Sequence, residues 1–509
     1  MRWATLVLIC GAVVLTSCGG GGGGASGQSS GSVVVQPPVL PPPPPPPRGT
    51  VIGGATLVPA TLAGGASATT LEPGELKLLV DASVVLGTAL TSTPVCAITT
   101  YTLKYHTVDA MAAATDASTA VMVPSGKDPA CQGSRPVLLY AHGTTVKKTT
   151  DMADLSASEP LMIAALFAAQ GYIVVAPNYA GYAGSSLGYH AYLDAAQQSS
   201  DMVDALRAAR AAFGAMKAAA SSQLMLSGYS QGGYVALATQ RAMQTDYAGE
   251  FAVTAAAPLS GPYALLLTGD TIFRGAPTVG ATGFLPLVIN AGQRAGAALY
   301  AGTADIYEAR YATGIDTLLP GTRGFGDLVA AGKLPDDVLF AQDSLPQASG
   351  YASFFGADHL IRTAYRDAYL ADLRANPCNT SAASPLACAP AQPLRRWLLK
   401  NDLRTYTPTV PLFFCGGNED PVVSFTNTLA AGAYFAARGA TAVTGLDLEE
   451  TSPTAPYLRT RLQFAAAKQA LRLANKSVKD SYHAGLVAPL CLREARAFFD
   501  SAANRSPAS

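Results

Sequence analysis

The chain has 509 residues, of which 49% are hydrophobic and only 13% are charged. Its 34 basic and 34 acidic residues balance, which removes the electrostatic case for binding nucleic acid and the compositional case for an acidic disordered protein. The apolar fraction is ample for a large core, and 49 glycines with 35 prolines indicate a low-complexity segment as well.

The first residues predict a lipoprotein signal peptide over residues 1–18. Arg2 supplies a positive charge, and Ala4 to Ser17 is an apolar run too short to span a bilayer. The run ends in Leu15-Thr16-Ser17-Cys18, which resembles the lipobox of bacterial lipoproteins, whose cysteine is lipidated after cleavage. We therefore expect Cys18 to anchor the protein in the bacterial cell envelope, and Gly19 after it favours the outer membrane. The alternative is an ordinary secretory signal, which would release a secreted protein.

Residues 19–50 predict a tether between the anchor and the folded part. Gly19 to Gly24 is an unbroken glycine run, typical of a flexible coil, and Pro41 to Pro47 is a proline run that favours a stiff polyproline II rod. The folded domain is expected over residues 51–509.

From residue 51 the chain alternates apolar runs of strand length with helical patterns. Short continuous apolar runs are typical of buried strands in a parallel sheet. Strands are expected over residues 98–105, 120–123, 136–141, 172–176, 223–227 and 252–256, and helices over 160–170, 199–220 and 231–243. This alternation predicts an α/β fold with a mostly parallel sheet.

The alternation lapses between about residues 262 and 400, where helical patterns occur without a convincing buried strand. The clearest pieces cover residues 328–331, 339–343 and 359–376, and the same region contains apolar stretches such as Phe284 to Ile289. The sheet resumes at Val410 to Cys415. We interpret the interruption as a helical cap inserted between two strands, whose apolar stretches line a pocket, form a mobile lid or make up the cap's own core.

Six of the eight cysteines remain once Cys10 and Cys18 are set aside with the signal peptide. They are Cys96, Cys131, Cys378, Cys388, Cys415 and Cys491. Outside the cytoplasm an even number favours disulfides, but six cysteines allow 15 connectivities, so the pairing stays open. No C-x-x-C or H-E-x-x-H spacing occurs, and no metal site is expected.

The pattern G-x-S-x-G occurs three times, around Ser29, Ser186 and Ser230. A nucleophile elbow needs a strand, a sharp turn and a helix. Ser29 lies in the tether and Ser186 in a loop rich in glycine and tyrosine. Only Ser230, in Gly228-Tyr229-Ser230-Gln231-Gly232, follows a predicted buried strand and begins a helix, whose N-terminus favours developing negative charge. Ser230 is therefore the predicted nucleophile, and the alternative is an ordinary tight turn.

Such a serine needs a base, and the chain has five histidines. In proteins with this elbow the chain order is nucleophile, acid, histidine, which leaves His359 and His483. His359 falls in the helical insert, whereas His483 lies in a turn-like stretch after all the strands, so His483 is the predicted base. The acid is expected in the loop after the strand over 410–415, where Asp420 is the first choice and Glu419 the alternative.

An oxyanion hole needs two backbone donors near the serine. The N–H of Gln231 directly follows the predicted nucleophile, and Thr144 lies in His142-Gly143-Thr144 after an earlier strand. We predict that these two N–H groups form the hole. His142 is interpreted as a structural residue.

Together these motifs resemble the α/β-hydrolases, specifically a bacterial secreted branch similar to the fungal secretory lipases. The shared residues are His142-Gly143-Thr144, Gly228 to Gly232, Gly417 to Asp420 and His483, and the resemblance covers about residues 97–499. It implies a mostly parallel central sheet with a large helical cap inserted before the acid-bearing strand. A position that is often acidic in relatives is Asn178 here, so that acid's role does not carry over.

With this triad, the cysteine pairing can be predicted. Cys415 lies shortly before Asp420 and Cys491 shortly after His483, so contact between the acid and the base brings these cysteines together. We expect a Cys415–Cys491 disulfide, with Cys96–Cys131 and Cys378–Cys388 as the remaining local pairs.

The resemblance implies cleavage of carboxylic esters, as a carboxylesterase or a lipase, through an acyl-enzyme and without a cofactor. The substrate would be a small-molecule, lipid or polymer ester; acyl chain length, alcohol group and oligomeric state stay open. One alternative is a serine peptidase of the prolyl oligopeptidase type, for which the chain before Pro136 is too short to hold a propeller. The other is a non-catalytic surface lipoprotein, which would not need a complete triad and oxyanion loop.

Overall fold

The computed structural model describes residues 46–62, 64–83 and 87–504. The predicted signal peptide, Cys18 and most of the tether lie outside these residues. Among the helices that are described, none is long and apolar enough to cross a membrane.

The described strands form one large sheet of ten strands and a separate pair. Nine strands of the large sheet follow one another in the order β1-β5-β6-β8-β7-β9-β10-β11-β12, and β4 pairs with β5. Their bounds are β1 Val51–Leu57, β4 Thr70–Leu71, β5 Ala97–Val108, β6 Ala114–Ser125, β7 Arg135–Ala141, β8 Ile173–Pro177, β9 Ala220–Tyr229, β10 Ala255–Leu259, β11 Leu412–Gly416 and β12 Val443–Asp447, with β2 Ala60–Thr61 and β3 Ser67–Ala68 forming the pair.

Six adjacent strands, from β8 through β7, β9, β10 and β11 to β12, run parallel, and β1, β5 and β6 add antiparallel pairs at the other edge. The register aligns Leu138 of β7 with Val174 of β8 and Met225 of β9. All three side chains are fully buried. This explains why the central strands read as continuous apolar runs, because a parallel sheet is covered on both faces.

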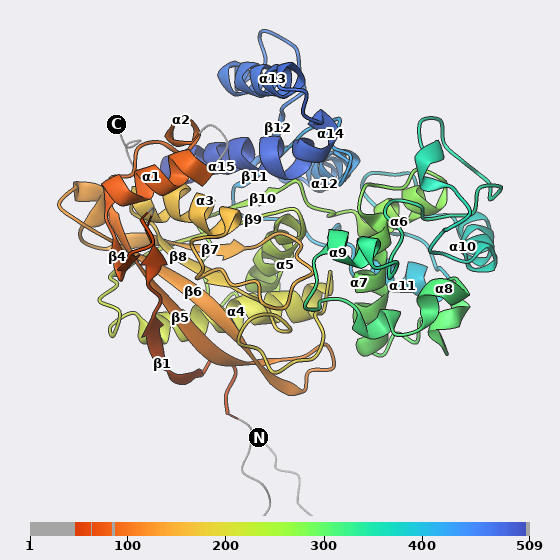
Figure 1. Ribbon diagram of the computed structural model, residues 1–509, viewed down its shortest axis with the longest axis horizontal. Helices are drawn as coiled ribbons and strands as arrows, with labels where there is room; N and C mark the ends of the chain where they lie inside the picture. Colours follow the sequence, from red (N-terminus) through yellow and green to blue (C-terminus); the bar gives the residue numbers. More distant parts are fainter. Residues whose placement is uncertain (1–45, 63, 84–86, 505–509) are drawn as a thin grey trace, which may run out of the picture. The chain divides into compact units, whose positions relative to one another are not determined.

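Helices cover both faces of the large sheet (Figure 1). Alternate residues of one strand enter different cores: Leu138 packs with one cluster of buried residues and Leu139 with the other. The cluster around Leu138 includes residues of α1 Pro73–Ser83, α3 Ser158–Leu166, α13 Leu458–Leu473 and α15 Ala488–Ala502. The cluster around Leu139 includes residues of α4 Ala195–Ala212, α5 Gln231–Thr245 and α12 Thr426–Ala437. Two short helices, α2 Thr88–Thr91 and α14 Val478–Ser481, complete this part.

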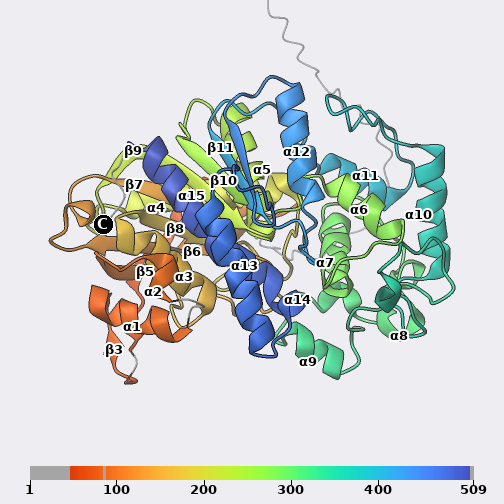
Figure 2. The ribbon, with the colours of Figure 1, turned by 90° about the horizontal axis from the view of Figure 1, so that it is seen from above.

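The remaining helices all lie in sequence between β10 and β11, and they gather at one end of the sheet (Figures 1 and 2). They are α6 Leu265–Phe273, α7 Ala281–Arg294, α8 Ala309–Ala312, α9 Phe325–Ala330, α10 Thr363–Ala375 and α11 Pro393–Lys400. In this insertion, which is described throughout, no residue joins the large sheet. The predicted architecture, a mostly parallel sheet with a helical cap before the strand that leads to Asp420, is confirmed.

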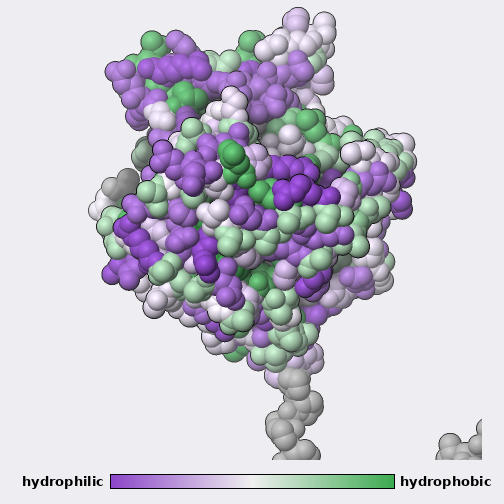
Figure 3. Space-filling view, turned by 90° about the vertical axis from the view of Figure 1, so that its right-hand side faces the viewer, coloured by the Kyte–Doolittle hydropathy of each residue, from purple (hydrophilic) through white to green (hydrophobic). Residues whose placement is uncertain are grey.

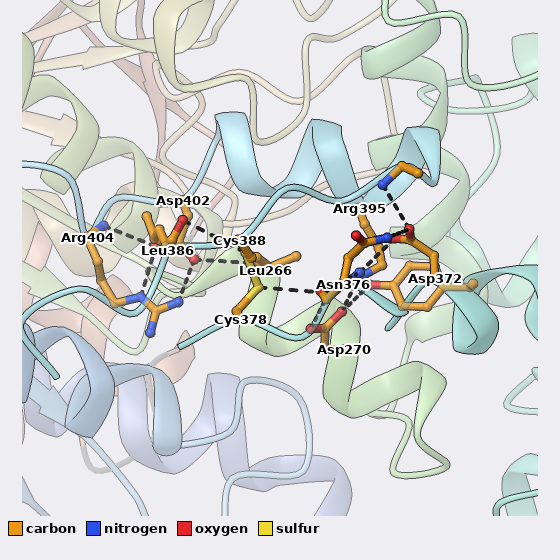
Figure 4. Close-up of a disulfide and its surroundings, with 12 residues drawn as sticks. Leu266, Asp270, Asp372, Asn376, Cys378, Leu386, Cys388, Arg395, Asp402 and Arg404 are labelled. Atoms are coloured by element: carbon orange, nitrogen blue, oxygen red, sulfur yellow. Dashed lines mark hydrogen bonds and ion pairs between the residues drawn. A yellow bond between two sulfur atoms is a disulfide. The ribbon is translucent and has the colours of Figure 1, made fainter. Parts of the chain in front are cut away.

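Buried ion pairs around Arg395 tie three cap helices together (Figure 4). From α11, Nε of Arg395 lies 3.0 Å from Oδ1 of Asp270 on α6, and Nη1 lies 2.6 Å from Oδ2 of Asp372 on α10. The Arg395 side chain is fully buried, and its Nη2 also lies 3.8 Å from Sγ of Cys378. Removing one partner of such a buried pair typically costs about 3–5 kcal/mol, because it leaves an uncompensated charge in the interior of the cap.

Two expected helices differ from the structure. The alanine-rich stretch predicted as a helix over 199–220 forms α4 only to Ala212, and Ala220 instead begins β9, where it pairs with Arg135. The chain turns between them, with Lys217 at a φ of 55°. Residues 339–343 do not form a helix, because Leu339 and Phe340 donate their N–H groups to the carbonyl of Phe354. In both places a neighbouring segment overrides the local helical preference.

The structure contains three disulfides, Cys96–Cys131, Cys378–Cys388 and Cys415–Cys491. These are the pairs expected from the triad argument. The folded unit begins earlier than residue 51, since Nε of Arg48 lies 2.9 Å from Oδ2 of Asp204 on α4 and the N–H of Gly49 donates to the carbonyl of His106 on β5. The last residues of the expected tether therefore pack against the fold.

Candidate active site

Ser230 stands at a strained turn between β9 and α5. Its φ of 61° and ψ of −121° lie in a region that L-residues rarely adopt, a strain typical of functional positions. The N–H of Ser230 donates to the carbonyl of Leu259 on β10, which fixes the turn. A Cβ at Gly228 or Gly232 would overlap backbone atoms, including the carbonyl oxygen of Ala141. The two glycines are therefore required for the close approach that exposes the serine.

His483 and Asp420 are in contact beside this turn. Nδ1 of His483 lies 2.6 Å from Oδ2 of Asp420, whose side chain is fully buried. The other oxygen, Oδ1, accepts from the N–H groups of Val422 at 2.9 Å and Val423 at 3.2 Å. A carboxylate held in this way fixes the proton of the imidazole on Nδ1 and leaves Nε2 able to accept a proton.

His483 lies in a π-helical turn, Tyr482–Val487, rather than in the loop that the sequence predicts. Its Nε2 is buried and has no hydrogen-bond partner among the described residues. Ser230 lines the same cavity, but the two side chains are not hydrogen-bonded to each other in this state of the described chain. Hydrogen bonds of this kind often tighten only when substrate is bound.

Tyr229, which precedes the serine, holds the histidine from the other side. Its hydroxyl donates to the carbonyl of His483 at 2.5 Å, and the two rings lie 4.8 Å apart. Burial, followed by the charge of Asp420, raises the pKa of Tyr229 well above 10. The hydroxyl therefore stays protonated and serves as a donor. Sequence reasoning missed this residue, although its place inside the G-x-S-x-G motif could have drawn attention to it.

The two expected oxyanion donors flank the serine. Thr144 and Gln231 both line the cavity that contains Ser230, and the structure gives no acceptor for either N–H among the described residues. The neighbouring N–H of Gly143 is already engaged, since it donates to Oε1 of Glu159 at 2.9 Å. Thr144 Oγ1 lies 2.8 Å from the hydroxyl of Tyr192, which holds the loop from its other side.

A second histidine, His190, contacts the side chain of Gln231. The Gln231 side-chain amide lies 2.7 Å from Nε2 of His190, and Nδ1 of His190 lies 3.1 Å from the carbonyl of Ala180. Burial lowers the pKa of His190 to about 3, so the ring is neutral, donates from Nδ1 and accepts at Nε2. Sequence analysis placed His190 only in a loop, and nothing in its local sequence indicates this contact.

The other candidates take no part in this cluster. Both ring nitrogens of His142 face backbone carbonyls, of Gly143 at 2.7 Å and Asn178 at 3.2 Å, which fits a structural role. His359 pairs with Glu308 in the cap at 3.2 Å and lines neither cavity at Ser230. Glu419 points away from His483 to Lys468, at 3.0 Å, and this ion pair lowers its pKa.

Two cavities meet at Ser230. The first, the cap-side cavity, has a volume of about 80 Å³, and its largely apolar wall includes residues of α6 and α7, among them Leu265, Ile272, Phe284 and Leu285. The outer face of the cap is instead a mosaic of hydrophilic and weakly hydrophobic side chains with small, scattered strongly hydrophobic spots (Figure 3). The apolar character of the cap-side cavity is thus an internal feature.

The second, the sheet-side cavity, has a volume of about 440 Å³ and alone of the two is lined by His483. Its wall includes the polar side chains of Ser83, Ser158 and Glu159 and the ring of Tyr140. Glu159 was not singled out from the sequence, and the only local signal is an acidic residue in the first turn of a helix. Among the described residues, no group of three His, Cys, Asp or Glu side chains is placed to hold a metal ion.

Comparison with known proteins defines the fold. The profile of the prolyl oligopeptidase family of peptidases matches residues 161–260, a minority of the chain that includes the Ser230 turn. No curated protein matches the sequence.

The ligand-bound rice cell wall degrading esterase LipA from Xanthomonas oryzae superposes with a TM-score of 0.67 at 23% identity, covering 89% of this chain and 98% of that chain. A protein from Legionella pneumophila reaches 0.62 at 18% identity, covering 90% and 99%. Candida antarctica lipase A in its closed state has a TM-score of 0.49 at 14% identity, covering 89% of this chain and 91% of that chain. The chain has the α/β-hydrolase fold.

Proposed function

We propose that the chain is a serine hydrolase of carboxylic esters, with Ser230 as nucleophile, His483 as base and Asp420 as acid. The observation that carries the proposal is the Asp420–His483 pair, 2.6 Å apart, whose unpartnered Nε2 shares a cavity with a serine at a strained strand-to-helix turn. A buried imidazole nitrogen without a partner is costly, and a reacting serine would supply that partner.

The proposed reaction follows from these contacts. Nε2 of His483 takes the proton of Ser230 while Oγ attacks the ester carbonyl carbon, and the carbonyl oxygen becomes an oxyanion held by the N–H groups of Thr144 and Gln231. The protonated His483 then gives its proton to the alcohol oxygen as the ester bond breaks. Water, deprotonated by His483, attacks the acyl-enzyme, and Ser230 regains its proton as the carboxylic acid leaves.

The two cavities support an assignment of the two halves of the substrate. The leaving alcohol must lie on the side of the group that protonates it, and His483 lines the sheet-side cavity only. The acyl chain then occupies the apolar cap-side cavity, where each buried CH₂ contributes about 0.8 kcal/mol. The proposed substrates are therefore esters of apolar acids. We further propose that the protein acts in the bacterial cell envelope, anchored to a membrane by lipid on Cys18.

A serine peptidase of the prolyl oligopeptidase type is the second candidate, because the profile of that family matches residues 161–260. The part of the chain described before β7 contains β1 to β6, which add to the edge of the large sheet or form a two-stranded pair. These strands supply no blades of a propeller. This favours the ester over the peptide.

The test compares the purified full-length chain with Ser230→Ala on p-nitrophenyl esters from acetate to palmitate. Losing the serine of a triad costs on the order of 10⁶ in kcat, so the variant should fall to background while its circular dichroism and melting temperature match the wild type. A folded wild-type protein that cleaves no ester, or a Ser230→Ala variant that keeps its activity, would overturn the proposal. Cleavage of proline-containing p-nitroanilide peptides in place of esters would favour the second candidate.

A further inference from the structure

The sheet-side cavity contains a carboxylate that none of the proposed reaction steps uses. Glu159 lies in the first turn of α3, where a negative charge is favoured by the helix dipole. Its Oε1 accepts two hydrogen bonds, from the N–H of Gly143 at 2.9 Å and from the hydroxyl of Tyr140 at 2.8 Å. Burial, followed by the charge of Glu159, raises the pKa of Tyr140 well above 10, so this hydroxyl stays a donor.

The second oxygen of Glu159 is not used within the protein. No donor to Oε2 occurs among the described residues, and no lysine or arginine lines the cavity that Glu159 faces. Gly143 is the residue before the proposed oxyanion donor Thr144, so this charge lies close to where negative charge would develop. A carboxylate there opposes an oxyanion. Glu159 is half-buried and faces the cavity, so Oε2 is open to a group that enters it.

The side of the cavity indicates which partner that is. Since His483 lines this cavity and protonates the leaving oxygen in the proposed reaction, the alcohol half of the ester lies here. The hydroxyl groups of Ser83, Ser158 and Tyr229 belong to the same wall. An acceptor with open lone pairs surrounded by hydroxyl groups is suited to a ligand that both donates and accepts hydrogen bonds.

We propose that Glu159 recognises the alcohol half of the substrate and that this alcohol is polyhydroxylated, such as a glycerol or sugar moiety, with one hydroxyl donating to Oε2. This inference rests on the proposed ester hydrolysis and specifies its substrate. Oε1 holds the Gly143–Thr144 loop, and Oε2 selects the leaving group. A hydrogen bond to a charged acceptor is among the stronger ones in proteins, so the selection is expected to be measurable.

The experiment uses the full-length chain and two esters with the same acyl group and carbon skeleton, 2,3-dihydroxypropyl butyrate and propyl butyrate. The readout is the ratio of their kcat/KM values. The wild type should favour the dihydroxypropyl ester. Glu159→Leu should lower the ratio about tenfold, because it removes the acceptor. Any loosening of the loop slows both esters alike and cancels in the ratio.

Glu159→Gln is the second variant, since glutamine keeps one oxygen for Gly143 and turns an amide toward the cavity. It should lower the ratio less than leucine does. Glu308→Gln, a carboxylate of the cap that lines neither cavity, is the matched control and should leave the ratio unchanged.

Two outcomes would overturn the inference. A wild type that cleaves both esters with a ratio near one, or variants that slow both esters without changing the ratio, would reduce Glu159 to an anchor of the loop while ester hydrolysis stands. A folded wild type that cleaves neither ester, and no p-nitrophenyl ester from acetate to palmitate, would remove the proposed function and this inference with it. The two failures are thus distinguishable.

Discussion

The two cavities at Ser230 differ in how the chain builds them. The wall of the cap-side cavity comes mainly from two consecutive helices of one insertion, α6 and α7, and it is largely apolar. The sheet-side cavity draws its wall from segments spread from residue 83 to residue 489, and it contains the polar groups. In the proposed assignment, acyl selection and bond cleavage therefore depend on different parts of the molecule. One depends on an exchangeable insertion and the other on the core of the fold.

The charges near the two cavities differ in the same way. In the cap, Arg395 is matched by Asp270 and Asp372, so the charges behind the apolar wall are satisfied within the protein. In the sheet-side cavity, Glu159 keeps one oxygen without a donor among the described residues. The charges of the cap are thus matched by partners within the protein, whereas Oε2 of Glu159 is available to a ligand.

Apart from loss of the serine, the largest effect is expected for substitution of Asp420, the acid of the proposed triad. Asp420→Asn should lower kcat about 10⁴-fold, because the histidine loses its tautomer and the imidazolium loses its partner. Rates for acetate and octanoate esters should fall by the same factor, since the acid does not touch either half of the substrate. Glu419→Gln, at the neighbouring carboxylate that pairs with Lys468, should stay near wild type. A loss confined to one chain length would contradict the assignment.

A substitution that narrows only the cap-side cavity tests whether the two cavities bind different halves of the substrate. Leu285 lines the cap-side cavity and is half-buried, so Leu285→Trp has room to adjust and should shorten the space for the acyl chain. Excluding four methylenes should lower kcat/KM for octanoate on the order of a hundredfold, at about 0.8 kcal/mol per CH₂, while acetate is cleaved as before. Leu462→Trp on α13, where the leucine is 61% exposed, is the matched control. Equal losses on acetate and octanoate would disprove the assignment of this cavity to the acyl chain.

The smallest effect concerns His190, beneath Gln231 at the edge of the cap-side cavity. Burial lowers the pKa of His190 from 6.5 to about 3. Between about pH 3 and pH 6.5 this side chain is therefore protonated in the unfolded chain and neutral in the folded chain. The free energy of unfolding should therefore fall as the pH drops below 6.5, by about 1.4 kcal/mol per pH unit from this group.

Urea unfolding of wild type and His190→Gln at pH 6.5 and pH 4.5 measures this contribution. The variant should show a shallower loss of stability on acidification, because it has no proton to bind at this position. His106→Gln on β5 is the matched control. Equal acid sensitivity of His190→Gln and the wild type would mean that burial does not depress this pKa in solution.

The sequence was sufficient for the parts of the fold that follow simple periodicities. Continuous apolar runs located β7, β8, β9 and β11, and the turn at Ser230 was separated from two identical motifs because only there does a strand lead into a helix. The chain order of serine, acid and histidine then selected Asp420 and His483, which the fold brings into contact. Their catalytic roles stay predictions.

The rest depends on contacts between distant segments, which local patterns do not contain. His190 meets Gln231 across 41 positions, and Glu159 meets Gly143 across 16. The cap helices are short, and α7 contains Pro286, so their boundaries carry weak signals. The alanine-rich stretch after α4 has a helical composition, but the pairing of Ala220 with Arg135 draws it into β9.

The Cys415–Cys491 disulfide joins two cysteines that are 76 positions apart in the sequence, and the covalent loop that it closes contains both Asp420 and His483. A single cut within this loop, for example in the largely exposed stretch between β12 and α13, would leave two pieces that remain covalently joined next to the acid and the base. The piece that carries the histidine could not diffuse away until the sulfur bridge was reduced. The proposed pair of acid and base therefore stays covalently linked after proteolytic cleavage of the segment that separates Asp420 from His483 in the sequence.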